Sequence, residues 1–236
     1  GVIKSVARLT YSEVEAQLLN GLKDTKYKES LEASFALFNK LILNKGYRGA
    51  LDFSINEPFL KLNKVGAIEN IENRKRLNAH KLIEEFMLAA NISAADFLSH
   101  HAEQGIYRIH EHPESLKVER LSQVLRNRGI NWKGDREDIN NLAPFINKLN
   151  KREDASILNM LILQSMQRAE YSTVNKGHFG LKFDRYTHFT SPIRRYPDLL
   201  VHRLIIATLT KKDFNFDGLQ LTLEDCSIKE KSAEFA

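Results

Sequence analysis

The sequence lacks most features that would mark a secreted protein or a membrane protein. It has one cysteine, Cys226, so no disulfide can form within the chain and a reducing cytoplasm is the expected compartment. The longest stretch without a charged residue, 155–167, has 13 residues, which is too short for a transmembrane helix. No basic segment followed by an apolar one opens the chain as a signal peptide would.

Several common active-site motifs are also missing. The sequence has no glycine-rich phosphate loop, no Gly-x-Ser-x-Gly elbow and no cysteine set with zinc spacing. Its 11 aspartates are scattered, without a pair close enough in sequence to suggest a divalent-metal site. His110 and His112 flank Glu111, but a single His-x-His pair is a weak metal signal. The sequence therefore predicts no metal ligands in this chain.

What the sequence contains is typical of a globular protein that binds a polyanion. The 236 residues are 42% hydrophobic and 28% charged, with a net charge of +5. The segment 168–203 holds seven Lys or Arg against three Asp or Glu, together with six aromatic residues. Such a segment suits a polyanion with stackable bases. A solvated basic face beside ordinary core aromatics explains the same composition, and composition does not separate the two.

Hydrophobic periodicity predicts an α+β fold that is rich in helices. The strongest helix is expected at 78–100. Alternation at Leu51, Phe53 and Ile55, and again at Phe179, Leu181 and Phe183, predicts strands, and Leu60 with Leu62 suggests another. Further helices are expected from Ser30, over 119–128, 138–149, 154–169 and 199–209, and from Thr222.

Both ends of the sequence suggest a fragment. The chain starts at Gly1 without a methionine, and the helix expected from Thr222 meets no stop signal before Ala236. We therefore expect a piece of a longer protein.

The segment His188–Asp198 is the most informative for chemistry. Ser191 can cap a helix that starts at Pro192, which would place Arg194 and Arg195 at its beginning. Backbone N–H groups and guanidinium groups together bind phosphate well. Arg194 and Asp198 are four residues apart, so one is expected to orient the other. A capped helix start with a purely structural Arg–Asp pair remains an alternative.

Three other residues are candidates for contacts with a nucleic acid. Glu84 lies on the less apolar face of the 78–100 helix, with Asn91 two turns further on, and its carboxylate can accept from a sugar hydroxyl or a base. Tyr11 and Phe53 can stack on bases. The alternative without a function is a solvated surface glutamate for Glu84 and a core-packing phenylalanine for Phe53.

Five sequence blocks together resemble one known family. They are Ala7-Arg-Leu-Thr-Tyr11, Ala79–Asn91, Tyr107-Arg-Ile-His110, Gly177-His-Phe-Gly-Leu181 and His188-Phe-Thr-Ser-Pro-Ile-Arg-Arg-Tyr-Pro-Asp198. In composition, order and spacing they resemble the catalytic RNB domain of the ribonuclease II and ribonuclease R exoribonucleases, closest to the bacterial ribonuclease R branch. The resemblance runs from Ala7 to about Ala233, and its last block is highly specific.

The resemblance implies a function and roles for five residues. Members degrade RNA processively from the 3′ end to nucleoside 5′-monophosphates. Arg194 matches the arginine that contacts the scissile phosphate, and Arg195 beside it is taken as an RNA contact. Tyr11 matches an aromatic residue of the channel wall, Glu84 a glutamate at the terminal nucleotides, and Phe53, more loosely, the aromatic residue that stacks on the terminal bases.

The resemblance also implies what this chain does not contain. The family's aspartate cluster, which holds Mg²⁺, precedes the Ala7–Tyr11 block. The chain is therefore expected to be a partial RNB domain, 1–236, without the upstream aspartate-bearing part and without flanking cold-shock and S1 domains. Its expected partners are the 3′ end of single-stranded RNA and the missing part of its own domain, with no membrane.

Three functional readings follow for the chain. The parent protein is expected to be an exoribonuclease, while the chain alone is expected to be inactive. The alternatives are a fragment that binds single-stranded RNA without cleaving it, and a helical interaction scaffold.

Overall fold

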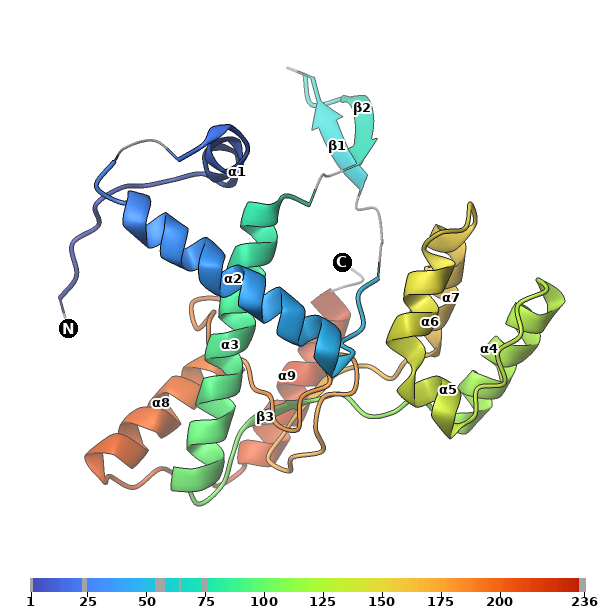
Figure 1. Ribbon diagram of the computed structural model, residues 1–236. Helices are drawn as coiled ribbons and strands as arrows, with labels where there is room; N and C mark the ends of the chain where they lie inside the picture. The colour runs from blue at the N-terminus through green and yellow to red at the C-terminus, as the bar shows by residue number, and fades with distance from the viewer. Residues whose placement is uncertain (1, 23–24, 54–57, 64, 74–75, 234–236) are drawn as a thin grey trace. The chain divides into compact units, whose positions relative to one another are not determined.

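The computed structural model describes residues 2–22, 25–53, 58–63, 65–73 and 76–233. They form two compact units, one of residues 1–47 and 55–87 and the other of residues 48–54 and 88–236 (Figure 1). Helices predominate and the strands are short and antiparallel, which confirms the α+β prediction. Among the described residues, none of the helices is long and apolar enough to cross a membrane.

The first unit combines three helical segments with a β-hairpin. A capping box starts the first helix, because the Glu13 N–H donates to Thr10 Oγ1 and the Thr10 N–H donates to a Glu13 carboxylate oxygen at 2.7 Å. In the hairpin Leu60 lies opposite Ile71. The elements are α1 (Tyr11–Asn20), α2 (Lys28–Arg48), β1 (Pro58–Leu62), β2 (Ile68–Asn73) and the first turns of α3 (Asn78–His101).

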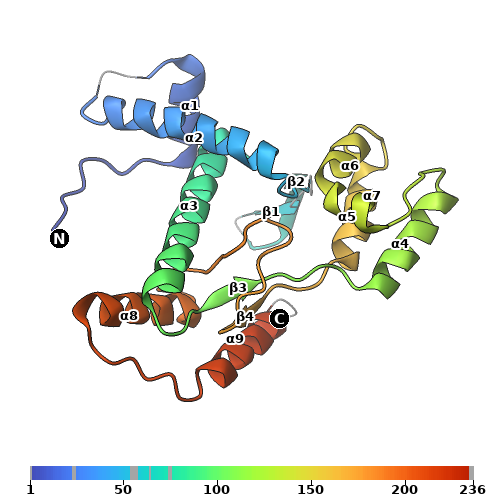
Figure 2. The same ribbon diagram turned by 60° about the horizontal axis from the view of Figure 1, so that its bottom comes forward.

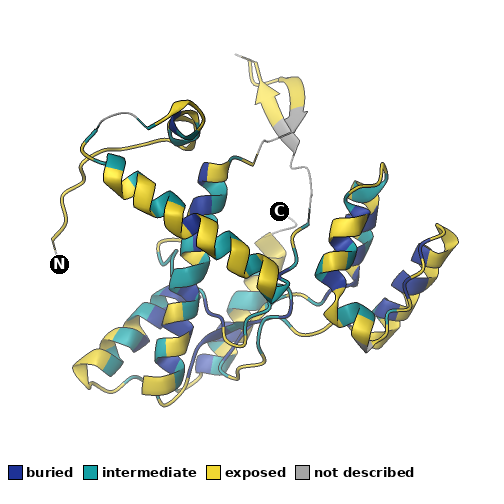
Figure 3. Cartoon of the chain, viewed as in Figure 1, coloured by how far each residue is buried: buried dark blue, intermediate teal, exposed yellow. Residues whose placement is uncertain are grey.

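The second unit contains a cluster of short helices with its own apolar core. Leu125, Ile146, Leu158 and Ile162 are fully buried there, and the buried Trp132 ring stacks on Phe145. The buried faces of these helices turn toward one another (Figure 3). The elements are α4 (Ser115–Asn127), α5 (Arg136–Asn140), α6 (Leu142–Leu149) and α7 (Ala155–Ser165).

A second core in the same unit lies between a two-stranded sheet and three helices. Leu98, Ile106, Val201 and Leu223 are its most buried members. The sheet lies beside the C-terminal helix of the described chain. The helix that comes before it in the sequence also contacts this C-terminal helix (Figure 2). The elements are the end of α3, β3 (Tyr107–Ile109), β4 (Glu170–Ser172), α8 (Tyr196–Thr210) and α9 (Leu219–Ala233).

Two of the expected strands are not strands. Leu51 and Phe53 pack on the α4–α7 core in an irregular segment, where the Leu51 N–H donates to the Gly180 carbonyl at 2.9 Å. Ile55 lies outside the described residues. The stretch from Phe179 to Phe183 is a turn, because Lys182 adopts a φ of +54° and the His178 N–H bonds the Phe183 carbonyl at 2.8 Å.

Helix boundaries differ from the predictions where local geometry intervenes. The helix expected at 138–149 is two helices separated by Asn141, which caps the end of α5 and precedes α6. The helix expected at 154–169 ends at Ser165, because the backbone at Met166 is extended (φ −71°, ψ 155°), and residues 170–172 form β4. The helix expected from Ser30 begins at Lys28 and includes Gly46, and the helix expected from Thr222 begins at Leu219. The strongest prediction, 78–100, is confirmed within one residue.

Candidate functional site

The turn that carries Arg194 is not the start of a helix. The N–H groups of Arg194 and Arg195 donate to the Ser191 carbonyl at 3.3 and 3.1 Å, and α8 begins only at Tyr196. Pro197 explains this correction, because it has no N–H to donate to the carbonyl of Ile193, four residues before it, while it fits the first turn of a helix. Arg195, just before the helix, is accordingly extended, with φ −124° and ψ 117°.

Asp198 anchors this turn from the first turn of α8. Its side chain is fully buried, and Arg195 donates to its two oxygens from Nε at 2.9 Å and from Nη2 at 2.8 Å. The Ser191 N–H donates to the same carboxylate at 2.8 Å. The sequence predicted that Asp198 would pair with Arg194, and this is wrong, because the extended backbone at Arg195 brings that guanidinium to the carboxylate instead.

Arg194 is consequently left facing solvent. Its side chain is exposed, and among the described residues no hydrogen bond or ion pair involves its guanidinium. Two neighbouring arginines therefore have different surroundings: Arg195 is held by a buried carboxylate, and Arg194 is exposed to solvent. A guanidinium on a fixed turn is well suited to bind a phosphate group.

Asn91 anchors the other end of the same loop. The amide is 3% exposed, and its Oδ1 accepts from the N–H groups of Phe189 at 2.9 Å and Thr190 at 3.2 Å. Its Nδ2 donates to the Tyr186 hydroxyl at 2.9 Å. On α8, His202 bonds the Phe189 carbonyl through Nε2 at 2.9 Å and stacks on the Phe189 ring.

Buried aromatic rings support the loop from behind. The Tyr186 ring contacts His178 and His188 edge to face, with centroids 5.2 and 5.7 Å away. Burial lowers the pKa of His178 to about 3 and of His188 to about 2, assisted by the neighbouring cations. A hydrogen bond of 2.8 Å joins His188 Nδ1 to Tyr171, whose pKa burial raises to about 12. These rings are neutral at pH 7, and their role is to support the fold of the loop.

Tyr11 and Glu84 both belong to the first unit. Tyr11 is the first residue of α1, and its ring stacks on His80 of α3 with centroids 4.2 Å apart. Glu15 fixes this arrangement by accepting hydrogen bonds from the Ala79 N–H at 2.9 Å and from Asn78 at 3.0 Å, at the free N-terminus of α3. His80 lies one turn before Glu84, so Tyr11 is brought to the same face of α3 as Glu84.

Glu84 is not a solitary carboxylate. It forms an ion pair with Arg76, and Lys45 of α2 lies 3.9 Å away. The adjacent Glu85 is 4% exposed and lies 3.3 Å from the same Lys45 ammonium. The side chain of Glu84 is still 36% exposed, so it can reach a ligand while its charge is partly balanced.

Phe53 belongs to the second unit and is half-buried. It packs against the α4–α7 core, as the ordinary sequence reading of this residue had it. Of the five candidate residues, the structure brings together Arg194 with Arg195, and Tyr11 with Glu84.

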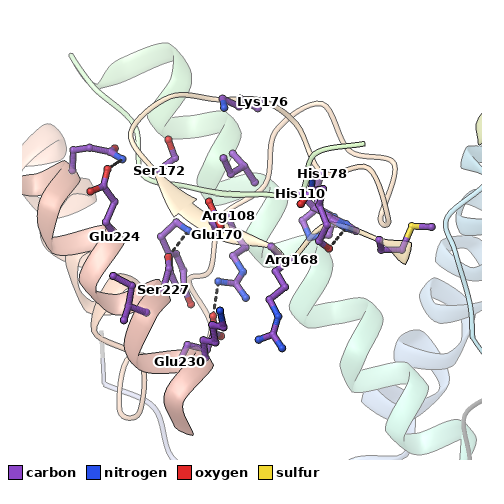
Figure 4. Close-up of a pocket in the computed structure, with 18 of the residues that line it drawn as sticks. Arg108, His110, Arg168, Glu170, Ser172, Lys176, His178, Glu224, Ser227 and Glu230 are labelled. Carbon is purple, nitrogen blue, oxygen red and sulfur yellow. Dashed lines mark hydrogen bonds and ion pairs between the residues drawn. The ribbon is translucent and has the colours of Figure 1, made fainter. Parts of the chain in front are cut away.

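A separate cavity of about 1030 Å³ lies between the β3–β4 sheet, the end of α7 and α9. Of its charged lining residues, Arg108 donates to Glu230 at 2.7 Å (Figure 4), and Lys176 pairs with Glu111, which does not line the cavity. The Tyr171 N–H donates to Ser227 on α9 at 3.0 Å. The described residues that line it include none of the five candidates. These contacts hold α9 on the sheet.

The carboxylates of the described residues do not form a magnesium site. Across the described ranges, no three His, Cys, Asp or Glu side chains gather into a group that could hold a metal ion. His110 uses both ring nitrogens inside the fold, with Nε2 on the Gln167 carbonyl at 2.9 Å and Nδ1 accepting from the Gly180 N–H at 3.1 Å. The described residues therefore do not fit the aspartate cluster that the resemblance implies for Mg²⁺.

Sequence reasoning did not assign roles to Asn91 or His202. Asn91 lies on the face of the 78–100 helix that the sequence marks as less apolar, so the pattern gave no signal that its amide is buried and requires hydrogen-bond partners. Its partners, almost 100 residues further along the chain, could not be read from the sequence.

Comparison with known proteins places these features in one family. The RNB domain family model matches residues 1–211. Ribonuclease R of Vibrio parahaemolyticus serotype O3:K6 is 36% identical over 255 aligned residues, which cover 100% of this chain and 30% of that protein. Ribonuclease R of Escherichia coli (strain K12) is 38% identical over 217 residues, covering 89% of this chain and 27% of that protein. The chain thus spans about a third or less of these relatives.

Solved structures agree with the sequence comparison. Mycoplasma genitalium RNase R in complex with ribose methylated single-stranded RNA is 28% identical, with a TM-score of 0.83 over 95% of this chain and 36% of that chain. Yeast Ssd1, described as a pseudonuclease, is 22% identical with a TM-score of 0.69, which shows the fold alone. Because the family model covers most of its residues, the chain belongs to the RNB domain family.

Proposed function

We propose that this chain is the RNA-holding part of an exoribonuclease domain that hydrolyses single-stranded RNA from its 3′ end to nucleoside 5′-monophosphates. The observation that carries the proposal is the exposed Arg194 guanidinium on a turn anchored at both ends by Asn91 and Asp198. Support comes from the Ribonuclease R relatives and from the M. genitalium RNase R structure with single-stranded RNA.

In this proposal Arg194 binds the scissile phosphate. Negative charge develops on phosphate oxygens during hydrolysis, and a guanidinium that is already fixed in place stabilises it without reorganising. Glu84 accepts from a ribose 2′-hydroxyl near the 3′ end, a group that distinguishes RNA from DNA. Tyr11 and Phe53 stack on bases, and each such contact contributes about 1–3 kcal/mol.

The proposal assigns no step to a metal ion. Magnesium dependence of the whole protein is part of the proposal and would need carboxylates other than those described here. A cytoplasmic location is proposed from the single cysteine.

A second candidate function is binding of single-stranded RNA without cleavage. The exposed Arg194 supports it equally, since a guanidinium binds a phosphodiester whether or not that bond is then hydrolysed. The fold shared with a protein described as a pseudonuclease also shows that this fold does not by itself imply catalysis.

The experiment that separates these functions uses a 5′-labelled single-stranded RNA, incubated with the 236-residue chain and with the whole protein, in magnesium and in EDTA. Magnesium-dependent shortening from the 3′ end by the whole protein supports the exoribonuclease. Salt-sensitive binding without shortening by either sample supports the second function.

Arg194→Ala in the whole protein tests the assigned role. It is expected to lower kcat by roughly 10²–10³, as loss of one fixed donor to a developing oxyanion does. Arg120→Ala is the matched control, because Arg120 is exposed on α4 and its loss changes the net charge by the same amount. Unchanged turnover in Arg194→Ala, or an equal loss in Arg120→Ala, would remove Arg194 from the mechanism.

A further inference from the structure

We infer that Asn91 is a positioning residue that directs Arg194 toward the RNA phosphate, by fixing the backbone at Phe189 and Thr190. The inference rests on the proposed function of Arg194 and adds to it a residue of α3 that touches no substrate itself. It assigns Arg195 and Asp198 to the same device, as the anchor on the other side of Arg194.

The first step is the path of the backbone between the two anchors. Asn91 Oδ1 accepts the consecutive N–H groups of Phe189 and Thr190, and Asp198 accepts the N–H of the next residue, Ser191. Three successive backbone donors are thus held by two buried side chains, one on α3 and one on α8. The turn that carries Arg194 starts directly from this fixed stretch.

The second step is the closure of the turn behind Arg194. Arg195 is the residue after it, and its guanidinium holds both oxygens of Asp198 at 2.8 and 2.9 Å. The backbone of Arg194 is therefore fixed on both sides while its own side chain is exposed. A fixed backbone limits the directions in which the guanidinium can point, which reduces the ordering that RNA binding must supply.

The third step is that an apolar side chain of similar volume cannot take over the role of Asn91, because it has no hydrogen-bond acceptor. Its amide is 3% exposed, so removing it leaves the two N–H groups of Phe189 and Thr190 without their acceptor in a largely buried place. The loop then has to move to reach water. Asn91→Asp keeps an acceptor oxygen at the same position, whereas Asn91→Leu keeps similar volume and removes it.

The test is a double-mutant cycle on binding of a 5′-fluorescein-labelled single-stranded RNA. Arg194→Ala, Asn91→Leu and the double variant are made in the 236-residue chain, and the dissociation constant is measured by fluorescence anisotropy. We expect Arg194→Ala to weaken binding about tenfold, the size of one lost charged hydrogen bond. In the Asn91→Leu background, Arg194→Ala should cost less than about twofold, and Asn91→Asp should restore most of the affinity.

A matched control separates positioning from general loss of stability. Asn159→Leu makes the same substitution at a fully buried asparagine of α7, whose amide donates to Asn150 at 2.7 Å and does not bond the Arg194 loop. It lowers stability too, but Arg194→Ala should still weaken binding about tenfold in that background. Equal and additive costs of Arg194→Ala in the Asn91→Leu and Asn159→Leu backgrounds overturn the inference.

Hydrogen exchange gives a readout that does not depend on RNA. Amide exchange at residues 189–191 should speed up at least tenfold in Asn91→Leu and not in Asn159→Leu, and unchanged exchange in Asn91→Leu overturns the inference. If Arg194→Ala binds RNA as well as the original chain, the proposed phosphate contact fails and the inference fails with it. A tenfold loss in Arg194→Ala that is additive with Asn91→Leu refutes the inference alone.

Discussion

At the scale of the residue, two adjacent arginines illustrate how burial decides chemical role. The Arg195 guanidinium is bonded to a carboxylate with no exposed surface, while Arg194 next to it is exposed. A buried carboxylate requires its partner, because an unpaired charge away from water is costly. The free arginine is thus available to a ligand because its neighbour satisfies the buried charge.

Arg195→Lys tests this division of roles through stability. One ammonium group cannot reproduce the two parallel contacts on Asp198, so the free energy of unfolding should fall by about 2 kcal/mol, measured by urea denaturation. Arg185→Lys is the control, since Arg185 pairs with Asp96 at 3.2 Å on the exposed surface, where such a pair contributes less than about 1 kcal/mol. Equal losses in the two variants would show that the Arg195 pair is not special.

The half-buried His178 and His188 predict a pH dependence of stability. The pKa values of His178 and His188 in the folded chain, about 3 and about 2, lie below the unfolded value of about 6.5. The unfolded chain therefore binds more protons, and stability is constant above pH 6.5 and falls as the pH drops below it. Each histidine contributes a slope of about 1.4 kcal/mol per pH unit.

Thermal melting between pH 7 and pH 5 measures this effect. We expect the melting temperature to fall with pH, and the fall to become shallower in His188→Phe, which removes one titrating ring. His100→Phe serves as the comparison, because the His100 side chain is 57% exposed. A pH profile of His188→Phe parallel to that of the original chain would refute the assignment.

At the scale of the element, sequence periodicity predicted best where one helix face is continuously buried. The helix expected at 78–100 is confirmed because its apolar residues recur over six turns. The strands β3 and β4 have only three residues each and pair across some 60 positions of sequence. Three residues are too few to show an alternation of apolar and polar side chains. Whether these segments form strands is therefore decided by their pairing in the folded chain. The alternation at Phe179–Phe183 was misleading because this segment is a turn. Phe179 packs in the α4–α7 core and Phe183 stacks on Tyr186, without a strand.

The docking of α1 on α3 gives a prediction at this scale. Glu15 joins α1 to the start of α3, because it accepts from the Ala79 N–H and from the side-chain amide of Asn78. Glu15→Ala should release α1 and increase the rate of limited chymotrypsin cleavage after Tyr11, Leu18 and Leu19 several-fold, because cleavage follows local opening. Glu32→Ala, on the exposed side of α2, should leave the rate unchanged. Identical cleavage patterns for both variants would contradict the role of Glu15.

At the scale of the whole molecule, the chain combines two compact units, and its candidate residues divide between them. Tyr11 and Glu84 belong to the first unit, and Phe53, Arg194 and Arg195 to the second. A net charge of +5 favours association with a polyanion. Binding of single-stranded RNA through phosphate contacts releases counterions, so it should weaken with salt.

Salt dependence measures this contribution directly. The logarithm of the association constant for single-stranded RNA should fall linearly with the logarithm of salt concentration, by about 0.7 for each phosphate contact. Arg194→Ala should reduce that slope by about 0.7, whereas Arg120→Ala should leave it unchanged. Equal affinity for the RNA at roughly 50 and 200 mM potassium chloride would argue against phosphate contacts.

The sequence by itself determined the family, the α+β class and the strongest helix. These depend on short blocks of neighbouring residues and on the regular spacing of apolar residues along one helix, and both are visible in the local sequence. Only the tertiary structure decided which arginine is free. Pro197 delays α8, the backbone at Arg195 becomes extended, and Asp198 takes Arg195 rather than Arg194. The tertiary structure also decided the role of Asn91, since an amide finds its partners by the packing of segments far apart in sequence.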